Sequence, residues 1–183
     1  ERIFKGIPFT VANPPQIFRG EPGEKELAAA FVERATSSSK YVPRPPRTFQ
    51  VETTDHGAWV RLSDVSPKRT LFYCHGGGYV WGNSSDYHEF AARLCRTLQA
   101  EVFLLDYRLA PAHQCPAPLE DSVAAWQAAL ARGMDPDRTG IAGDSAGGGL
   151  TLATLQALKQ KNLPLPAAAW LISPLLDLTG SGE

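Results

Sequence analysis

The chain has 183 residues, of which 43% are hydrophobic and 20% are charged, a balance typical of a globular protein with a buried core. Its formal net charge of −1 argues against the basic surface with which proteins bind nucleic acid or acidic membranes. No apolar run reaches the length of about 20 residues that crosses a bilayer, so we expect no membrane span.

The first 47 residues differ in composition from the rest of the chain. They are rich in proline, and only residues 24–38 have the spacing of apolar side chains that predicts an amphipathic helix. We interpret residues 1–47 as a lid or cap segment rather than a separate domain. Residues 48–183 then form the N-terminal part of a catalytic domain.

After residue 47 the pattern becomes regular. Two short alternating segments flank a turn-like sequence at 55–57, which predicts an antiparallel hairpin. Apolar strands then alternate with helices, which predicts an α/β fold with a mostly parallel sheet and helices on both faces. The expected elements are the hairpin strands 49–52 and 58–62, strand 70–74, helix 85–99, strand 101–105, helix 119–132, strand 139–142, a helix from about 145 and strand 167–172.

Three cysteines occur in this pattern, at positions 74, 95 and 115. Their odd number does not suit a disulfide framework, and their spacing matches no zinc site. Cys74 and Cys95 fall on apolar segments, so we expect ordinary packing thiols and a reducing, cytoplasmic location. We expect no metal and no cofactor.

The sequence GDSAG at 143–147 follows a strand and opens a helix. This is the context of a nucleophile elbow, in which a serine occupies a strained turn between flanking glycines. Ser145 is therefore the expected nucleophile, and the N–H of Ala146 at the helix start is suited to hold an oxyanion. The alternative is a glycine-rich helix start with a capping serine.

The sequence HGGGY at 75–79 follows another apolar strand. Successive glycines expose backbone N–H groups and let a substrate carbonyl approach, so we assign Gly76 and Gly77 to the oxyanion hole together with Ala146. A phosphate loop is disfavoured because no G-K-[ST] follows. We interpret His75 as a residue that fixes the loop by hydrogen bonding.

Three ordered motifs, HGGGY at 75–79, DYRLAP at 106–111 and GDSAGG at 143–148, resemble those of the hormone-sensitive-lipase-like esterases, bacterial family IV of the α/β-hydrolase superfamily. The resemblance covers the chain from about residue 49 to its end. It implies hydrolysis of short-acyl carboxylic esters through an acyl-enzyme, and a lid built from the N-terminal segment. The family pattern has Glu where this sequence has Ala112, so an ion pair through that carboxylate is missing.

The rest of a catalytic triad does not follow Ser145. In α/β-hydrolases the acid and then the histidine come after the serine, yet all four histidines of this chain precede it. Asp177 and Glu183 are the only later carboxylates. We therefore expect a truncated chain whose acid and base lie beyond residue 183, and little activity from this segment alone. A variant triad that uses Asp177 or His113 is the alternative.

The predicted function is a serine carboxylesterase acting on a small-molecule ester, with Tyr79 and Trp81 at an apolar substrate pocket. A non-catalytic small-molecule-binding homologue, as the plant gibberellin receptor is to these esterases, and a related deacetylase or lactonase are the alternatives. Self-association into a homo-oligomer stays open.

Overall fold

The computed structural model describes residues 49–64 and 66–177. The hairpin strands alternate in polarity, the strands after them are short apolar runs, and the longer segments between those runs form the helices. The predicted helix at 24–38 and the lid segment lie outside the described residues. The elements are β1 (Phe49–Thr54), β2 (Gly57–Leu62), β3 (Arg69–Cys74), the 3-10 turn η2 (Ser84–Tyr87), α2 (His88–Leu98), β4 (Ala100–Leu105), α3 (Ala117–Ala131), the 3-10 turn η3 (Pro136–Arg138), β5 (Thr139–Asp144), α4 (Ala146–Gln160) and β6 (Ala168–Ile172).

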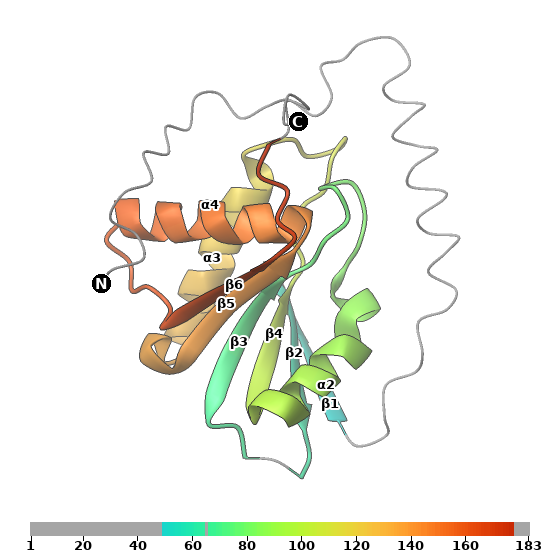
Figure 1. Ribbon diagram of the computed structural model, residues 1–183, viewed down its shortest axis with the longest axis vertical. Coiled ribbons are helices and arrows are strands. Elements are labelled where there is room, and N and C mark those ends of the chain that lie inside the picture. Colours follow the sequence, from blue (N-terminus) through green and yellow to red (C-terminus); the bar gives the residue numbers. More distant parts are fainter. Residues whose placement is uncertain (1–48, 65, 178–183) are drawn as a thin grey trace.

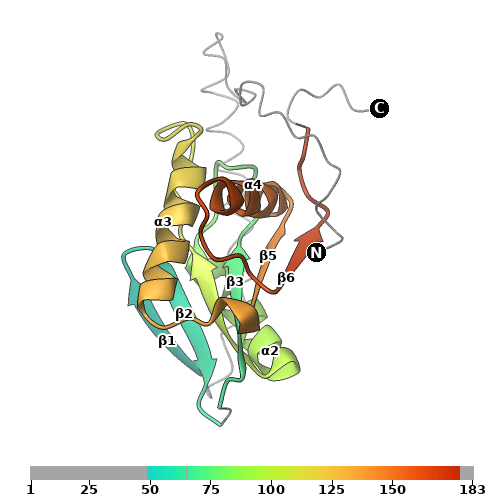
Figure 2. The ribbon, with the colours of Figure 1, turned by 90° about the vertical axis from the view of Figure 1, so that its left-hand side faces the viewer.

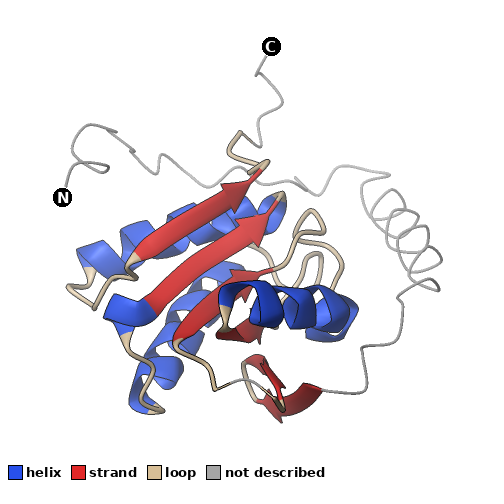
Figure 3. Cartoon of the chain, turned by 60° about the horizontal axis from the view of Figure 1, so that its bottom comes forward, coloured by secondary structure: helices blue, strands red, loops and turns tan. Residues whose placement is uncertain are grey.

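The described strands form one sheet in the order β1-β2-β4-β3-β5-β6 (Figure 1). The hairpin β1–β2 is antiparallel and β2 pairs antiparallel with β4, whereas β4, β3, β5 and β6 run parallel to their neighbours. Figure 3 shows the twist of this sheet between its helices. The predicted mixed sheet with an antiparallel N-terminal hairpin is confirmed.

Helices cover both faces of the sheet, with α3 and α4 on one side and α2 on the other (Figure 2). The side chains of the inner strands β2, β3, β4 and β5 alternate between two apolar clusters, as the pleat of a strand requires. On β3, Phe72 and Cys74 face the cluster under α3 and α4, while Leu71 and Tyr73 face the cluster under α2. The two neighbouring strands, β4 and β5, are mostly buried, and they hold β3 and fix the position of the loop that follows it.

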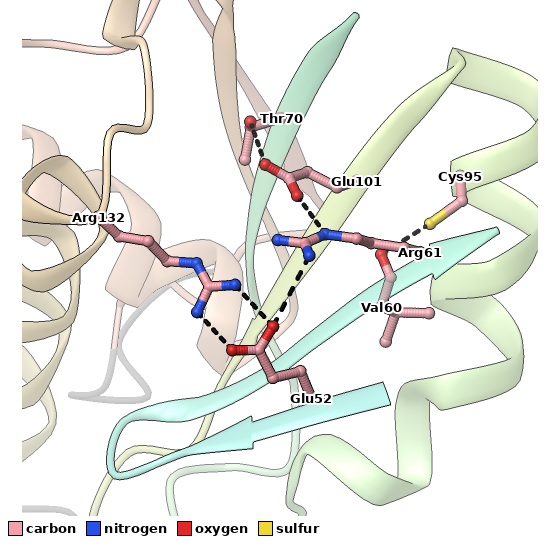
Figure 4. A network of polar contacts seen from close by, with 7 residues as sticks. All are labelled: Glu52, Val60, Arg61, Thr70, Cys95, Glu101 and Arg132. Carbon is pink, nitrogen blue, oxygen red and sulfur yellow. Dashed lines mark hydrogen bonds and ion pairs between the residues drawn. The ribbon is translucent and has the colours of Figure 1, made fainter. Parts of the chain in front are cut away.

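Ion pairs fasten the hairpin to the rest of the sheet (Figure 4). Both terminal nitrogens of Arg132, the residue after α3, donate to the Glu52 carboxylate on β1 at 2.6 Å. Arg61 on β2 donates to Glu101 on β4 at 2.6 Å. These contacts connect residues that are far apart in the sequence and hold the antiparallel edge against the parallel part of the sheet.

The thiols follow the sequence prediction in part. All three cysteines are free; Cys74 and Cys95 are buried packing residues, whereas Cys115 is exposed. None of the helices within 49–64 and 66–177 is long and apolar enough to cross a membrane.

Candidate active site

Ser145 occupies a sharp turn between β5 and α4. Its backbone has φ 51° and ψ −119°, a conformation that a residue with a Cβ rarely adopts and that costs free energy. The Ser145 N–H donates to the carbonyl of Ile172 at 2.9 Å, and its own carbonyl accepts from Leu175 N–H at 2.8 Å. Neighbouring strand β6 and the segment after it therefore hold the strained residue in place.

The Ser145 side chain does not cap the helix that it precedes. It makes no capping hydrogen bond, and the residue is exposed although Ala146 and Gly147 directly after it are buried. This geometry disfavours the alternative of an ordinary capping serine. It leaves a hydroxyl group at the carboxyl edge of the sheet, at the start of a helix whose first N–H groups have no helical acceptor.

Glycine is required on both sides of the serine because the backbones approach closely. A Cβ on Gly143 would lie 2.3 Å from the carbonyl oxygen of Gly147, and one on Gly147 would lie 2.1 Å from that of Cys74. Both contacts involve backbone atoms, which cannot move away as the end of a side chain can. The glycines of the motif therefore let the elbow lie directly against the end of β3.

The glycine loop lies beside this elbow because Cys74 of β3 pairs with Gly143 of β5. Residues 77–79 all have positive φ, at 121°, 62° and 63°. The chain then turns back, and the N–H groups of Val80 and Trp81 both donate to the carbonyl of Gly77, at 3.0 and 3.2 Å. A Cβ on Gly77 would lie 2.1 Å from the Trp81 carbonyl oxygen, so this turn admits only glycine there.

The three expected oxyanion donors differ in their surroundings. The Gly76 N–H already donates to Asp144 Oδ1 at 3.0 Å and lies 3.2 Å from the Tyr87 hydroxyl oxygen. This engagement disfavours Gly76 as a donor to a substrate, because an N–H that already donates within the loop is not free to bind it. The oxyanion-hole assignments of Gly76, Gly77 and Ala146 stay predictions. Within the described part of the chain, the N–H groups of Gly77 and Gly78 donate to no acceptor.

The buried ring of His75 holds the glycine loop in place. Its ring is 2% exposed, stacks on Tyr107 with ring centroids 4.3 Å apart, and donates through Nδ1 to the Gly76 carbonyl at 2.7 Å. Burial holds the pKa of His75 below its ordinary value. A neutral ring with Nδ1 engaged agrees with the loop-fixing interpretation.

Tyr79 and Trp81 both lie in the loop and are half-buried. The Tyr79 ring packs on the apolar cluster under α4 and meets Tyr107 edge-on, at 6.1 Å between centroids. Its hydroxyl oxygen lies 3.1 Å from where a Cβ of Gly149 would be. Tyr79 therefore braces the loop against α4, and its role at a substrate pocket stays a prediction, as does that of Trp81.

The loop after β4 is locked by ion pairs, although Ala112 replaces the carboxylate of the family pattern. The Arg108 guanidinium donates to Asp121 at 2.8–2.9 Å and to Glu120 at 3.1 Å, and the Arg108 N–H also donates to Asp121. Asp121 belongs to α3. Glu120 and Asp121 of this helix thus form the ion pairs with Arg108 for which the sequence alone indicated no partner.

No base is positioned on the nucleophile by the residues that the structure describes: none of their histidines is hydrogen-bonded to the Ser145 hydroxyl. Nor do these residues include a cluster of three or more His, Cys, Asp or Glu side chains that could hold a metal ion.

Comparison with known proteins agrees with this geometry. The sequence profile of the α/β-hydrolase fold matches residues 71–183. The chain belongs to the α/β-hydrolase family. Among relatives of this α/β-hydrolase is an acetyl-hydrolase of Streptomyces hygroscopicus, 40% identical over 162 residues that make up 87% of this chain and 53% of the relative.

Comparison with solved structures indicates which group of α/β-hydrolases the chain resembles. An esterase from the bacterial hormone-sensitive lipase family superposes with a TM-score of 0.74 at 34% identity, over 89% of this chain and 61% of that one. A structure of EstE5 soaked with p-nitrophenyl butyrate superposes with a TM-score of 0.75 at 35% identity, over 88% and 61%. The resemblance to hormone-sensitive-lipase-like hydrolases is thereby confirmed. The chain spans about half the length of the curated relative and about three fifths of the solved ones.

Proposed function

We propose that the protein is a serine carboxylesterase that hydrolyses small, short-acyl esters through an acyl-enzyme on Ser145. The observation that carries the proposal is the strained, exposed Ser145 at the carboxyl edge of the sheet. It lies beside a loop whose Gly77 and Gly78 N–H groups donate to no acceptor among residues 49–64 and 66–177. Strain at an exposed polar residue is typical of a functional site.

In the proposed reaction, the Ser145 oxygen bonds to the ester carbonyl carbon while a histidine outside the described residues takes its proton. The negative charge on the carbonyl oxygen is held by the N–H groups of Gly77, Gly78 and Ala146. Loss of the alkoxide, protonated by that histidine, leaves the acyl-enzyme, and water then releases the acid and restores the serine.

The substrate class rests on relatives rather than on a pocket. One relative is named an acetyl-hydrolase, and EstE5 was soaked with p-nitrophenyl butyrate. Both names fit a small acyl group. We propose that Tyr79 and Trp81 border the acyl site and that residues 1–47 cover it. We also propose that the protein is located in the cytoplasm.

The test is Ser145→Ala in the intact protein, with p-nitrophenyl butyrate as substrate. We expect kcat to fall by at least about 10⁴-fold, because the nucleophile of a triad cannot be replaced by the remaining groups. Ser63→Ala, at an exposed serine after β2, is the matched control and keeps wild-type kinetics. Retained turnover in Ser145→Ala would rule out the proposed nucleophile.

A non-catalytic binding homologue predicts a different result. Such a protein would bind a small molecule reversibly and hydrolyse no ester, with or without Ser145. Amide and lactone substrates, compared with esters in the same assay, separate the deacetylase and lactonase alternatives.

A further inference from the structure

Asp144 lies between the two motifs of the candidate site. It is the last residue of β5 and directly precedes Ser145. Its carboxylate is turned toward the loop after β3: Oδ1 accepts from the Gly76 N–H at 3.0 Å and from the Tyr73 hydroxyl at 2.9 Å, and Oδ2 accepts from the Tyr87 hydroxyl at 3.2 Å. Three donors from two separate segments thus converge on one side chain.

The hydrogen bond between Asp144 and Gly76 joins the two segments just past the point where the sheet ends. Strands β3 and β5 pair as far as Cys74 and Gly143, so no ladder hydrogen bond of the sheet extends to Gly76. The Asp144 carboxylate takes up the Gly76 N–H just past that point. A Cβ on Gly76 would lie 2.2 Å from Oδ2, so the first glycine of the loop is what admits the carboxylate.

Both phenols remain donors in this arrangement. Burial, followed by the nearby Asp144 carboxylate, raises the pKa of Tyr73 and of Tyr87 above the ordinary value. Tyr73 and Tyr87 are also in ring contact, with centroids 5.7 Å apart, and both pack on Phe90 of α2. The carboxylate is therefore held by side chains that are themselves fixed by packing.

We propose that Asp144 is a positioning residue: it ties the glycine loop to the nucleophile elbow and so sets the Gly77 and Gly78 N–H groups relative to Ser145. This inference rests on the proposed esterase function. It assigns no contact between Asp144 and substrate. Oriented donors stabilise an oxyanion only when they are held in place before the reaction, so loosening the loop lowers kcat more than it weakens substrate binding.

Whether kcat rises or falls on substitution of Asp144 distinguishes a role in positioning the loop from an effect of the carboxylate charge. A negative charge close to a developing oxyanion disfavours it, so removing that charge alone would raise the rate. Loss of the hydrogen bonds to the loop lowers the rate instead. Asp144→Ala removes both the charge and the acceptors, whereas Asp144→Asn removes the charge and keeps an oxygen for Gly76 and Tyr73.

The experiment measures kcat and KM for p-nitrophenyl butyrate in the intact protein. It also measures the inhibition constant of a trifluoromethyl ketone, whose hemiketal oxyanion needs the same Gly77 and Gly78 N–H donors. We expect Asp144→Ala to lower kcat by about 10²–10³-fold with KM changed less than about threefold. Inhibitor affinity falls in parallel, and Asp144→Asn recovers most of the loss. The control is Asp137→Ala, at an exposed aspartate before the other end of β5, which keeps wild-type values.

Two results would overturn the inference: wild-type kcat in Asp144→Ala, or an Asp144→Asn variant as slow as Asp144→Ala. If Asp144→Ala does not fold, Tyr87→Phe removes one donor to the carboxylate without changing its charge. Tyr87→Phe should lower kcat by a few-fold, and its effect on kcat should not add to that of Asp144→Asn in the double variant. Additive effects would contradict a role that Tyr87 and Asp144 share in holding the loop. Active Ser145→Ala would instead show that the esterase proposal itself has failed, so the two failures are distinguishable.

Discussion

A Cβ atom on Gly147 would lie 2.1 Å from the carbonyl oxygen of Cys74, so the backbone of the elbow lies directly against the end of the strand that carries the glycine loop. This contact joins the first turn of α4 to the end of β3. It explains in steric terms why the second glycine of the GDSAG sequence cannot be replaced.

Gly147→Ala is expected to move the elbow away from β3, lower the unfolding free energy by about 1–3 kcal/mol and abolish most ester turnover. Thermal unfolding and kcat are measured together. The matched control is Gly140→Ala on β5, whose Cβ would meet only Leu71 Cδ1 at 3.4 Å and the Ala168 carbonyl oxygen at 3.8 Å. Equal effects of the two substitutions would contradict the steric explanation.

Burial of His75 predicts how stability depends on pH. Burial lowers the pKa of His75 and of His88, so below the ordinary histidine value of 6.5 the unfolded chain binds protons that the folded chain does not. The unfolding free energy therefore falls as the pH is lowered through this range, by at most about 1.4 kcal/mol per pH unit for His75, and is level above it.

Denaturant unfolding of the intact protein between pH 5.5 and 7.5, about one unit on either side of the histidine value, measures this slope. His75→Gln should reduce the slope, because the buried ring that resists protonation is gone. A slope that is the same in His75→Gln and wild type would contradict the lowered pKa of His75 in the folded protein.

Arg132 is expected to stabilise the hairpin through two contacts. Its guanidinium pairs with Glu52 and also lies 5.0 Å from the centre of the Trp59 ring. Arg132→Ala removes both contacts, and the aromatic one contributes about 0.5–1 kcal/mol. Glu52→Gln removes the charge that pairs with Arg132 and, at 3.7 Å, with Arg61, but it leaves Arg132 against the Trp59 ring. It should therefore destabilise less than Arg132→Ala, and its effect should shrink in high salt.

Urea unfolding at low and high salt compares the two variants. Arg93→Ala, at an exposed ion pair within α2, is a control with little effect on stability. A Glu52→Gln variant that is as destabilised as Arg132→Ala at both salt concentrations would contradict a separate contribution from Trp59.

The alternation of apolar strands and helices was sufficient to predict the layers, because the inner parallel strands β3, β4 and β5 are mostly buried and have helices on both faces. Boundaries were less predictable. The helix expected from residue 85 begins at His88, after a 3-10 turn capped by Asn83 and Asp86. The helix expected from 119 begins at Ala117, because Pro118 fits the first turn of a helix, where no N–H is needed.

At the site, the sequence predicted the elbow and the glycine loop but not which N–H groups are free. Gly76 looks like its neighbours in the sequence, and only the fold brings Asp144 to its N–H. Asp144 occupies the unspecified position of the G-x-S-x-G pattern, and its place in the GDSAGG motif does not reveal which groups it contacts. Contacts of this kind depend on strand order, which places β3 beside β5.

The most direct test of the central claim is covalent labelling of the intact protein with paraoxon, followed by mass spectrometry of its peptides. We predict one diethylphosphoryl group per chain, attached to Ser145, with loss of ester hydrolysis in step with labelling. Complete inactivation with the label on another residue, or full activity with no label, would contradict Ser145 as the nucleophile.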